Sequence, residues 1–228
     1  MAIFNEVIDQ LKSKAKPENL KGMARYGMTS DNRLGISIPE LRKMAKEIGR
    51  DHQLALELWQ SCILDARILA SMVDKPEEVS EAQVEEWVKE FNSWDLCDQV
   101  CMNLFEKTPF VVQKIHDWSK REEEFVKRAT YTLIACLAVH DKQAQDEKFM
   151  RFFPIIKQGA TDERNFVKKA VNWALRNIGK RNPTLNKAAI KLAKEIREMN
   201  SKAAHWIAKD AIRELESEAV QKRLKERS

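Results

Sequence analysis

Apolar residues recur along the chain at the three- and four-residue spacing of an amphipathic helix. Segments 41–48 and 125–136 show this most clearly, because their apolar positions fall on one helical face. The positions are Leu41, Met44, Ala45 and Ile48 in the first segment, and Phe125, Ala129, Thr132, Leu133 and Cys136 in the second. No run of strict apolar–polar alternation marks a strand. The pattern predicts an all-α protein of about a dozen helices.

Capping and proline signals predict where several helices begin. Ser80-Glu81-Ala82-Gln83 has the form of a capping box. Proline is favoured in the first helical turn, and short polar side chains are favoured at the N-cap. These rules place first turns at Pro39, Pro109 and Pro183, and N-caps at Thr161, Asn182 and Ser201.

The predicted helices are short and follow one another in pairs joined by brief breaks. A helix-turn-helix unit that recurs at about 35 to 45 residues is typical of HEAT-like α-solenoids. We therefore expect a single HEAT-like repeat domain over residues 1–228, with a concave groove lined by the inner helix of each pair. The alternative is a globular helical bundle, which would bury Trp94 and Trp173 in a core.

The composition is that of a globular protein. Of its 228 residues, 43% are hydrophobic and 33% are charged, and six Gly and six Pro are few for a turn-rich β fold. No uncharged apolar run of about 18 residues is present, and Glu6 and Asp9 interrupt the stretch where a signal peptide would be apolar. We therefore expect no membrane span and no signal peptide.

The cysteines indicate a reducing compartment. Cys62, Cys97, Cys101 and Cys136 lie in apolar helical stretches, as expected for reduced core residues. Cys97 and Cys101 have no histidine at ligand spacing, so no metal site is expected. We expect a cytoplasmic protein, in a bacterial-type cytosol or associated with the nucleoid.

Positive charge is concentrated in the last third of the chain. Residues 164–228 hold 17 Lys or Arg and 7 Asp or Glu, a net charge of +10, whereas the whole chain has a net charge of +5. A basic region on an otherwise slightly acidic chain is expected for a polyanion partner. Solvated lysine-rich helix faces are the alternative explanation.

Two segments combine aromatic and charged side chains on one helical face. Trp94 and Asp98 are four residues apart, and Lys169, Trp173 and Arg176 follow the spacing i, i+4, i+7. A ring beside a carboxylate suits a cationic sugar or base, and a ring beside cations suits a phosphate chain. Together these faces suggest DNA chemistry. Core packing is the alternative for both tryptophans.

The chain resembles the AlkD-type DNA alkylation repair proteins, which are HEAT-like-repeat DNA glycosylases. The resemblance covers nearly the whole chain and rests on four segments. They read "MARYGMTSDNRLGISIPELRKMAK", "NSWDLCDQV", "FVKRAT" and "FVKKAVNWALRNIGKRNP". Residues 50–80 depart from better-known members. The resemblance implies an α-solenoid with a concave DNA-binding groove.

The same resemblance implies roles for individual residues. Asp98 matches the catalytic carboxylate, and Trp94 and Trp173 match the two cleft tryptophans. The residues expected to hold the DNA backbone are Arg128, Lys169, Arg176 and Lys180. Loop 27–37, the least helical segment, is expected to border the binding surface.

The implied activity is base excision repair of alkylation damage. The enzyme would hydrolyse the N-glycosidic bond of cationic N3- and N7-alkylated purines in double-stranded DNA, without a cofactor. Asp98 would stabilise the oxocarbenium-like sugar and position water. We expect a monomer with no obligate protein partner. The alternatives are a non-catalytic HEAT-like protein that binds damaged or branched DNA and a protein-binding scaffold.

Overall fold

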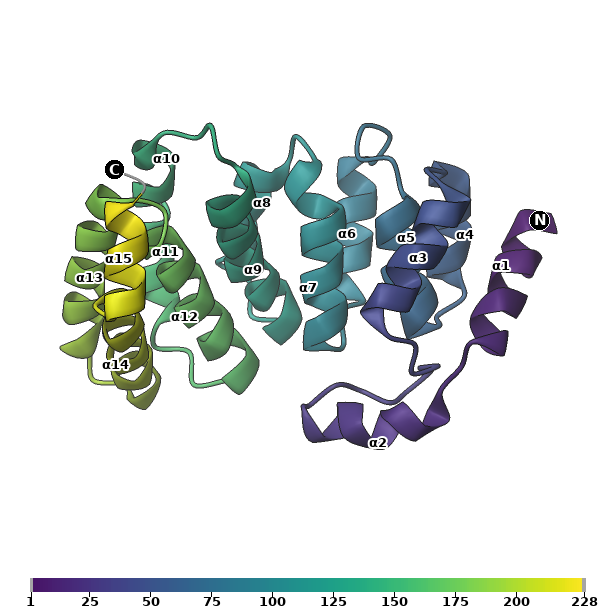
Figure 1. The fold of residues 1–228 in the computed structure, drawn as a ribbon, viewed down its shortest axis with the longest axis horizontal. Helices are drawn as coiled ribbons and strands as arrows, with labels where there is room; N and C mark the ends of the chain where they lie inside the picture. The colour runs from purple at the N-terminus through teal and green to yellow at the C-terminus, as the bar shows by residue number, and fades with distance from the viewer. Residues whose placement is uncertain (1, 227–228) are drawn as a thin grey trace. The chain divides into compact units, whose positions relative to one another are not determined.

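The computed structural model describes residues 2–226, and within that range the chain is helical with no strand (Figure 1). The all-α fold predicted from the apolar spacing is therefore confirmed. The elements are α1 (Ala2–Ser13), α2 (Pro17–Arg25), α3 (Ile38–Ile48), α4 (His52–Gln60), α5 (Leu64–Val73), α6 (Glu81–Lys89), α7 (Trp94–Asn103), the 3-10 helix η1 (Phe105–Lys107), α8 (Val111–Trp118), α9 (Glu124–His140), α10 (Asp146–Met150), α11 (Phe153–Gly159), α12 (Asn165–Gly179), α13 (Pro183–Arg197), α14 (Lys202–Leu215) and α15 (Glu218–Lys225).

The chain divides into two compact units. Unit 1 ends at Phe110 and unit 2 begins at Val111. Each unit is described below by itself, and the single domain expected over residues 1–228 stays a prediction. No helix among the described residues combines the length and the apolarity that a membrane crossing requires.

Unit 1 is built around α5, which packs against α1, α3, α4 and α7. Nearly every residue of α5 is buried, including the carboxylate residue Asp65. Asp65 accepts hydrogen bonds from the backbone N–H groups of Leu34 at 2.7 Å and Ile36 at 2.8 Å. A buried carboxylate that accepts two backbone donors is well compensated. The contact attaches the loop before α3 to the core.

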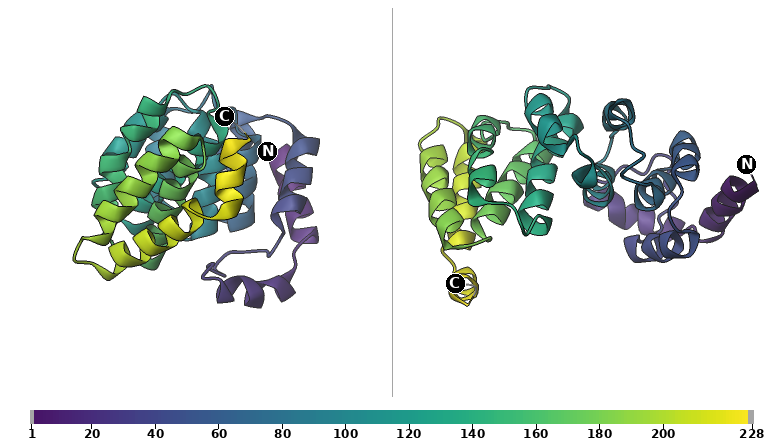
Figure 2. Two further views of the ribbon diagram at one scale, coloured as in Figure 1. Left: turned by 60° about the vertical axis from the view of Figure 1, so that its left-hand side comes forward. Right: turned by 90° about the horizontal axis from the view of Figure 1, so that it is seen from above.

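Unit 2 is built around α12, which packs against α9, α11, α13 and α14 (Figures 1 and 2). Residues about one repeat apart meet repeatedly. Arg128 contacts Phe166, Asn172 contacts Asp210, and each pair is separated by 38 residues in the sequence. This interval lies within the repeat length expected from the sequence. It shows that α9, α12 and α14 occupy equivalent places in successive helical pairs.

Most of the predicted helix starts agree with the structure. The side chains of Ser80, Asn182 and Ser201 each accept a hydrogen bond from the backbone N–H three residues later. Pro39 and Pro183 lie in the first turns of α3 and α13. The capping box at Ser80 is only half formed, because the Gln83 amide donates to Asp74 at 2.7 Å.

Two predicted starts are wrong by a few residues. Thr161 is not an N-cap, since α12 begins at Asn165 and the Thr161 hydroxyl donates to the Gln158 carbonyl. The Asp162 carboxylate accepts hydrogen bonds from the backbone N–H and the guanidinium of Arg164. Because residues 162–164 form this turn, α12 begins only at Asn165. Pro109 lies in a turn two residues before α8.

Candidate nucleic-acid interface

The first part of the predicted site lies at the start of α7, in unit 1. Trp94 is the first residue of the helix and is half-buried, and Asp98 follows one turn later with 8% of its surface exposed. Helical geometry places both on the same face. Asp98 is flanked by the fully buried thiols of Cys97 and Cys101. The carboxylate is therefore largely removed from water, and the field of a charge is screened less there than in bulk water.

Loop 26–37 supports Trp94 from outside the helix. The Trp94 indole Nε1 donates to the Tyr26 carbonyl at 3.0 Å, and the backbone N–H of Thr29 donates to the Ser93 hydroxyl at 3.4 Å. Tyr26 itself is 77% exposed. The segment expected to border the binding surface is thus attached to the N-terminus of α7.

A buried ion pair fixes the same loop. The Arg33 guanidinium donates to both carboxylate oxygens of Asp95, at 2.7 and 3.0 Å, and its Nε donates to the Thr29 carbonyl at 2.8 Å. Gly35 follows with φ +80°, where a Cβ would lie 2.4 Å from the Lys16 carbonyl oxygen. Glycine is therefore required at this turn. The ion pair and the glycine turn together restrict the backbone conformation of the loop where it meets α7.

The second part of the predicted site lies on α12, in unit 2. Lys169 is exposed, whereas Trp173, Arg176 and Lys180 are half-buried. The stripe spans three helical turns on one face. Trp173 is thus not a fully buried core residue, and the fully buried tryptophan of unit 2 is Trp118.

Arg128 occupies a different position from the other predicted cations. It lies on α9 and is only 6% exposed, and its guanidinium donates to the Phe166 carbonyl in the first turn of α12 at 2.6 Å. This contact joins two neighbouring repeats.

Carboxylates of α14 pair with two of the α12 cations. Arg176 forms ion pairs with Glu214 and, at 3.6 Å, with Asp210, and Lys180 forms one with Glu214 at 2.8 Å. Burial favours the neutral acid, but the hydrogen bond from Lys180 and the charges of Arg176 and Lys180 outweigh it and hold the pKa of Glu214 below its ordinary value. Asp210 also accepts from the Asn172 amide at 2.7 Å. Any phosphate at α12 competes with these carboxylates.

Sequence reasoning missed these two carboxylates. Asp210 and Glu214 are four residues apart on α14, and Glu214 follows Arg176 by 38 residues, the recurrent spacing of unit 2. The 38-residue interval could have predicted that Glu214 lies beside Arg176, and sequence reasoning did not use it. Sequence reasoning also missed Trp206 on α14. This tryptophan is 40% exposed, and the Lys168 Nζ lies 5.2 Å from the centroid of its ring.

The structure thus brings Trp94 and Asp98 together in unit 1. It separately brings Lys169, Trp173, Arg176 and Lys180 together in unit 2, with Arg128 bonded to the same helix. The convergence of both sets on one groove stays a prediction. Among the described residues, no three His, Cys, Asp or Glu side chains cluster in a way that could hold a metal ion.

Comparison with known proteins gives one family and one fold. The sequence profile of a family described as DNA alkylation repair enzyme matches residues 7–215. No curated protein matches the chain. One solved structure superposes with a TM-score of 0.77 at 20% identity, over 97% of this chain and 95% of its own. It is described as "a new family of proteins related to the HEAT-like repeat DNA glycosylases with affinity for branched DNA structures". The likeness confirms the HEAT-like repeat fold.

Proposed function

Because the chain belongs to the DNA alkylation repair enzyme family, we propose that it is a monofunctional DNA glycosylase. It hydrolyses the N-glycosidic bond of cationic N3- and N7-alkylated purines in double-stranded DNA. The observation that carries this proposal is the buried Asp98 carboxylate one helical turn after the half-buried Trp94 ring. A surface whose only task is to bind phosphates gains nothing from a carboxylate at that position.

The chemistry follows from the charge of the lesion. An N3- or N7-alkylated purine is already cationic, so it leaves without a general acid. Positive charge develops on the deoxyribose as the bond breaks. A carboxylate beside the sugar stabilises that charge and orients the attacking water. Asp98 meets this requirement without a cofactor or a metal ion.

Trp94 is proposed to assist Asp98 through its electron-rich face. Aromatic rings attract cations within about 6 Å of the ring centroid. The Trp94 ring is held by the bond from its Nε1 to the Tyr26 carbonyl. A ring held in this way loses little side-chain entropy when it meets the sugar cation. Trp173 is proposed to serve the same purpose from α12.

The cations of α12 are proposed to bind the DNA backbone. Lys169 is exposed, and no ion pair is found for it among the described residues. Arg176 and Lys180 would exchange Glu214 for phosphate when DNA arrives. Contacts of this kind set the register of the duplex without reading its sequence.

A second candidate function is non-catalytic binding of branched or damaged DNA. The observation that favours it is the shared fold with a protein described as having affinity for branched DNA. In that case the α12 cations would still bind phosphates. Asp98 would have no catalytic role, and no base would be released. The two functions therefore differ in one measurable product.

The deciding experiment is chromatographic analysis of bases released from methylated duplex DNA. We expect release of 3-methyladenine and 7-methylguanine by the unaltered protein. Asp98→Asn should slow release by about 100-fold or more, while DNA affinity is kept or rises because a carboxylate near phosphates has been removed. Asp9→Asn, the same chemical change at an exposed position of α1, is the matched control.

Equal rates for Asp98→Asn and the control would remove Asp98 from the catalytic role. If the unaltered protein binds duplex DNA but releases no base, the non-catalytic function replaces the glycosylase.

A further inference from the structure

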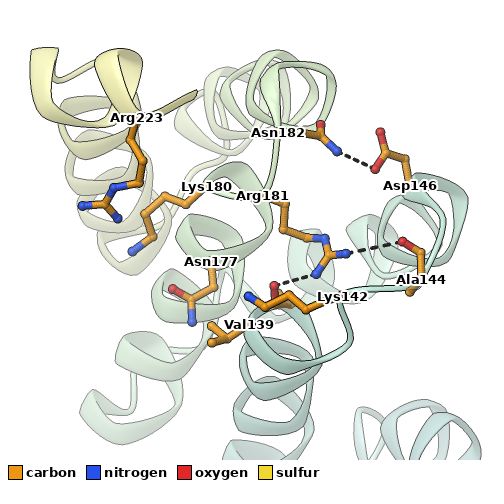
Figure 3. A pocket seen from close by; sticks show the side chains of 10 residues that line it. Val139, Lys142, Ala144, Asp146, Asn177, Lys180, Arg181, Asn182 and Arg223 are labelled. Atoms are coloured by element: carbon orange, nitrogen blue, oxygen red, sulfur yellow. Dashed lines mark hydrogen bonds between the residues drawn. The ribbon is translucent and has the colours of Figure 1, made fainter. Parts of the chain in front are cut away.

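A polar pocket of about 440 Å³ opens in unit 2 where α9 and α12 end (Figure 3). Four cationic side chains and one carboxylate line it, together with two amides. The cations are Lys142, Lys180, Arg181 and Arg223. Only Lys180 belongs to the residues assigned to DNA binding above. A pocket of this volume is large enough for a phosphate group with part of its ester.

Arg181 forms part of the wall of the pocket. Its guanidinium donates to the carbonyls of Ala138 at 2.7 Å and Asp141 at 2.9 Å, and no carboxylate pairs with it among the described residues. Its Nε is buried without a hydrogen-bond partner. Because guanidinium stays protonated in proteins, Arg181 gives the wall a positive charge, which the Phe149 ring at 3.9 Å and the nearby carboxylates of Asp141 and Asp146 offset in part. Free carbonyl oxygens at the end of α9 would repel an anion, but those of Ala138 and Asp141 accept hydrogen bonds from Arg181.

Two of the other cations are placed to meet a ligand, whereas Lys180 is paired with Glu214 at 2.8 Å. Lys142 and Arg223 are exposed, and neither forms an ion pair among the residues that the structure describes. Lys180 and Arg223 extend toward the same side in Figure 3, whereas Asp146 lies beyond Arg181. There Asp146 accepts from the Asn182 amide at 2.7 Å. The lining carboxylate is thus engaged away from Lys180 and Arg223.

We propose that this pocket is a phosphate-binding site that takes a backbone phosphate of DNA beyond those bound along α12. Lysine and arginine donors with unused N–H groups suit phosphate oxygens, and they exclude cationic ligands. DNA is favoured over a free phosphate compound because Lys180 joins the pocket to the α12 stripe, one turn after Arg176. In this respect the inference rests on the proposed DNA binding. It requires no base excision.

The test uses the full chain with Lys142→Ala and Arg223→Ala combined. Both side chains are exposed, so the fold should be unaffected, as circular dichroism would verify. The control combines Lys187→Ala and Lys202→Ala, two exposed lysines of α13 and α14 outside the pocket with the same total charge. Fluorescence anisotropy with an undamaged duplex gives the slope of log K against log salt for each protein.

We expect the pocket variant to lower the magnitude of that slope by about one to two relative to the control. Slopes equal to those of the control would overturn the proposal.

A second arm of the test identifies the source of the phosphate. Calorimetric titration with inorganic phosphate and with a mononucleotide should show no binding at micromolar concentrations. Micromolar binding that the pocket variant abolishes, with an unchanged duplex slope, would assign the pocket to a small phosphorylated ligand and overturn the DNA assignment. A protein that excises no base but shows the slope effect would refute the glycosylase and leave the pocket proposal standing.

Discussion

Glu214 is the residue whose placement most changes the expected behaviour of the DNA-binding cations. It pairs with both Arg176 and Lys180 in the absence of DNA. Glu214→Gln should therefore raise affinity for every duplex, damaged or not, because Lys180 loses its ion pair and Arg176 keeps only the longer one with Asp210. Glu216→Gln, which makes the same charge change at the exposed C-cap of α14, is the control for net charge. Equal affinities in the two variants would show that the α14 carboxylates do not compete with DNA.

The same residue predicts a pH dependence of stability. The pKa of Glu214 is lowered below its ordinary value of 4.5 in the folded protein. Its contribution is therefore fully present above that value and is lost as pH falls through the lower folded pKa. Glu214→Gln should lower the free energy of unfolding by about 1 kcal/mol at neutral pH, typical of a partly exposed ion pair. Denaturant unfolding at several pH values should show this difference shrinking toward zero in acid.

At the scale of elements, the attachment of loop 26–37 to α7 decides how Trp94 is held. Asp95 and Arg33 form a buried pair with two hydrogen bonds. Removing one partner of such a pair leaves a buried charge uncompensated. Asp95→Asn should then lower the free energy of unfolding by about 3 kcal/mol and slow excision by loosening the Trp94 support. Asp31→Asn, at an exposed position of the same loop, should do neither. A stable Asp95→Asn protein with normal excision would refute this role of the loop.

Removing a cation from α12 should weaken the binding of all DNA duplexes to a similar extent. Lys169→Ala should weaken binding to damaged and undamaged duplexes alike, and should lower the slope of log K against log salt by about one. Arg176→Ala should have the same direction of effect, reduced by the attraction that Glu214 already exerts on Arg176 in the free protein. Anisotropy titrations over a range of salt concentrations measure both. An unchanged slope in both variants would place α12 outside the DNA interface.

At the scale of the whole molecule, the proposed mechanism selects its substrate by the lesion's charge. If the sugar and the backbone are what the protein holds, a cationic base leaves readily whatever its size. Bulky cationic N3 or N7 adducts should then be accepted, whereas neutral lesions such as uracil or 1,N6-ethenoadenine should be poor substrates. A tight pocket around a flipped base would instead reject bulk and read the base edge. A panel of duplexes with methylated cationic, bulky cationic and neutral lesions compares these expectations.

Efficient removal of the neutral lesion, or rejection of every bulky cationic one, would refute this mechanism even if alkylpurine excision were established. The monomeric state and the cytoplasmic location expected from the sequence stay predictions, and both are open to direct measurement.

The sequence by itself determined those features of the protein that depend on local interactions. The apolar spacing identified an all-α repeat protein, and the N-caps at Ser80, Asn182 and Ser201 lie where their side chains can reach a backbone N–H three residues away. The faces shared by Trp94 with Asp98, and by Lys169 with Arg176, follow from helical geometry alone. Thr161 was misplaced because Asp162 and Arg164 form a competing turn.

The tertiary structure alone decided which charges neutralise one another. Glu214 lies 38 residues after Arg176, and Asp95 lies 62 residues after Arg33, beyond any local rule. The carbonyls that accept from Arg181 lie 37 to 43 residues before it. Their pairing depends on how neighbouring repeats stack, and stacking is governed by side-chain packing across many residues rather than by one spacing. The sequence therefore marked the cations of α12, whereas the fold showed that Glu214 already holds two of them and that Arg181 lines a pocket.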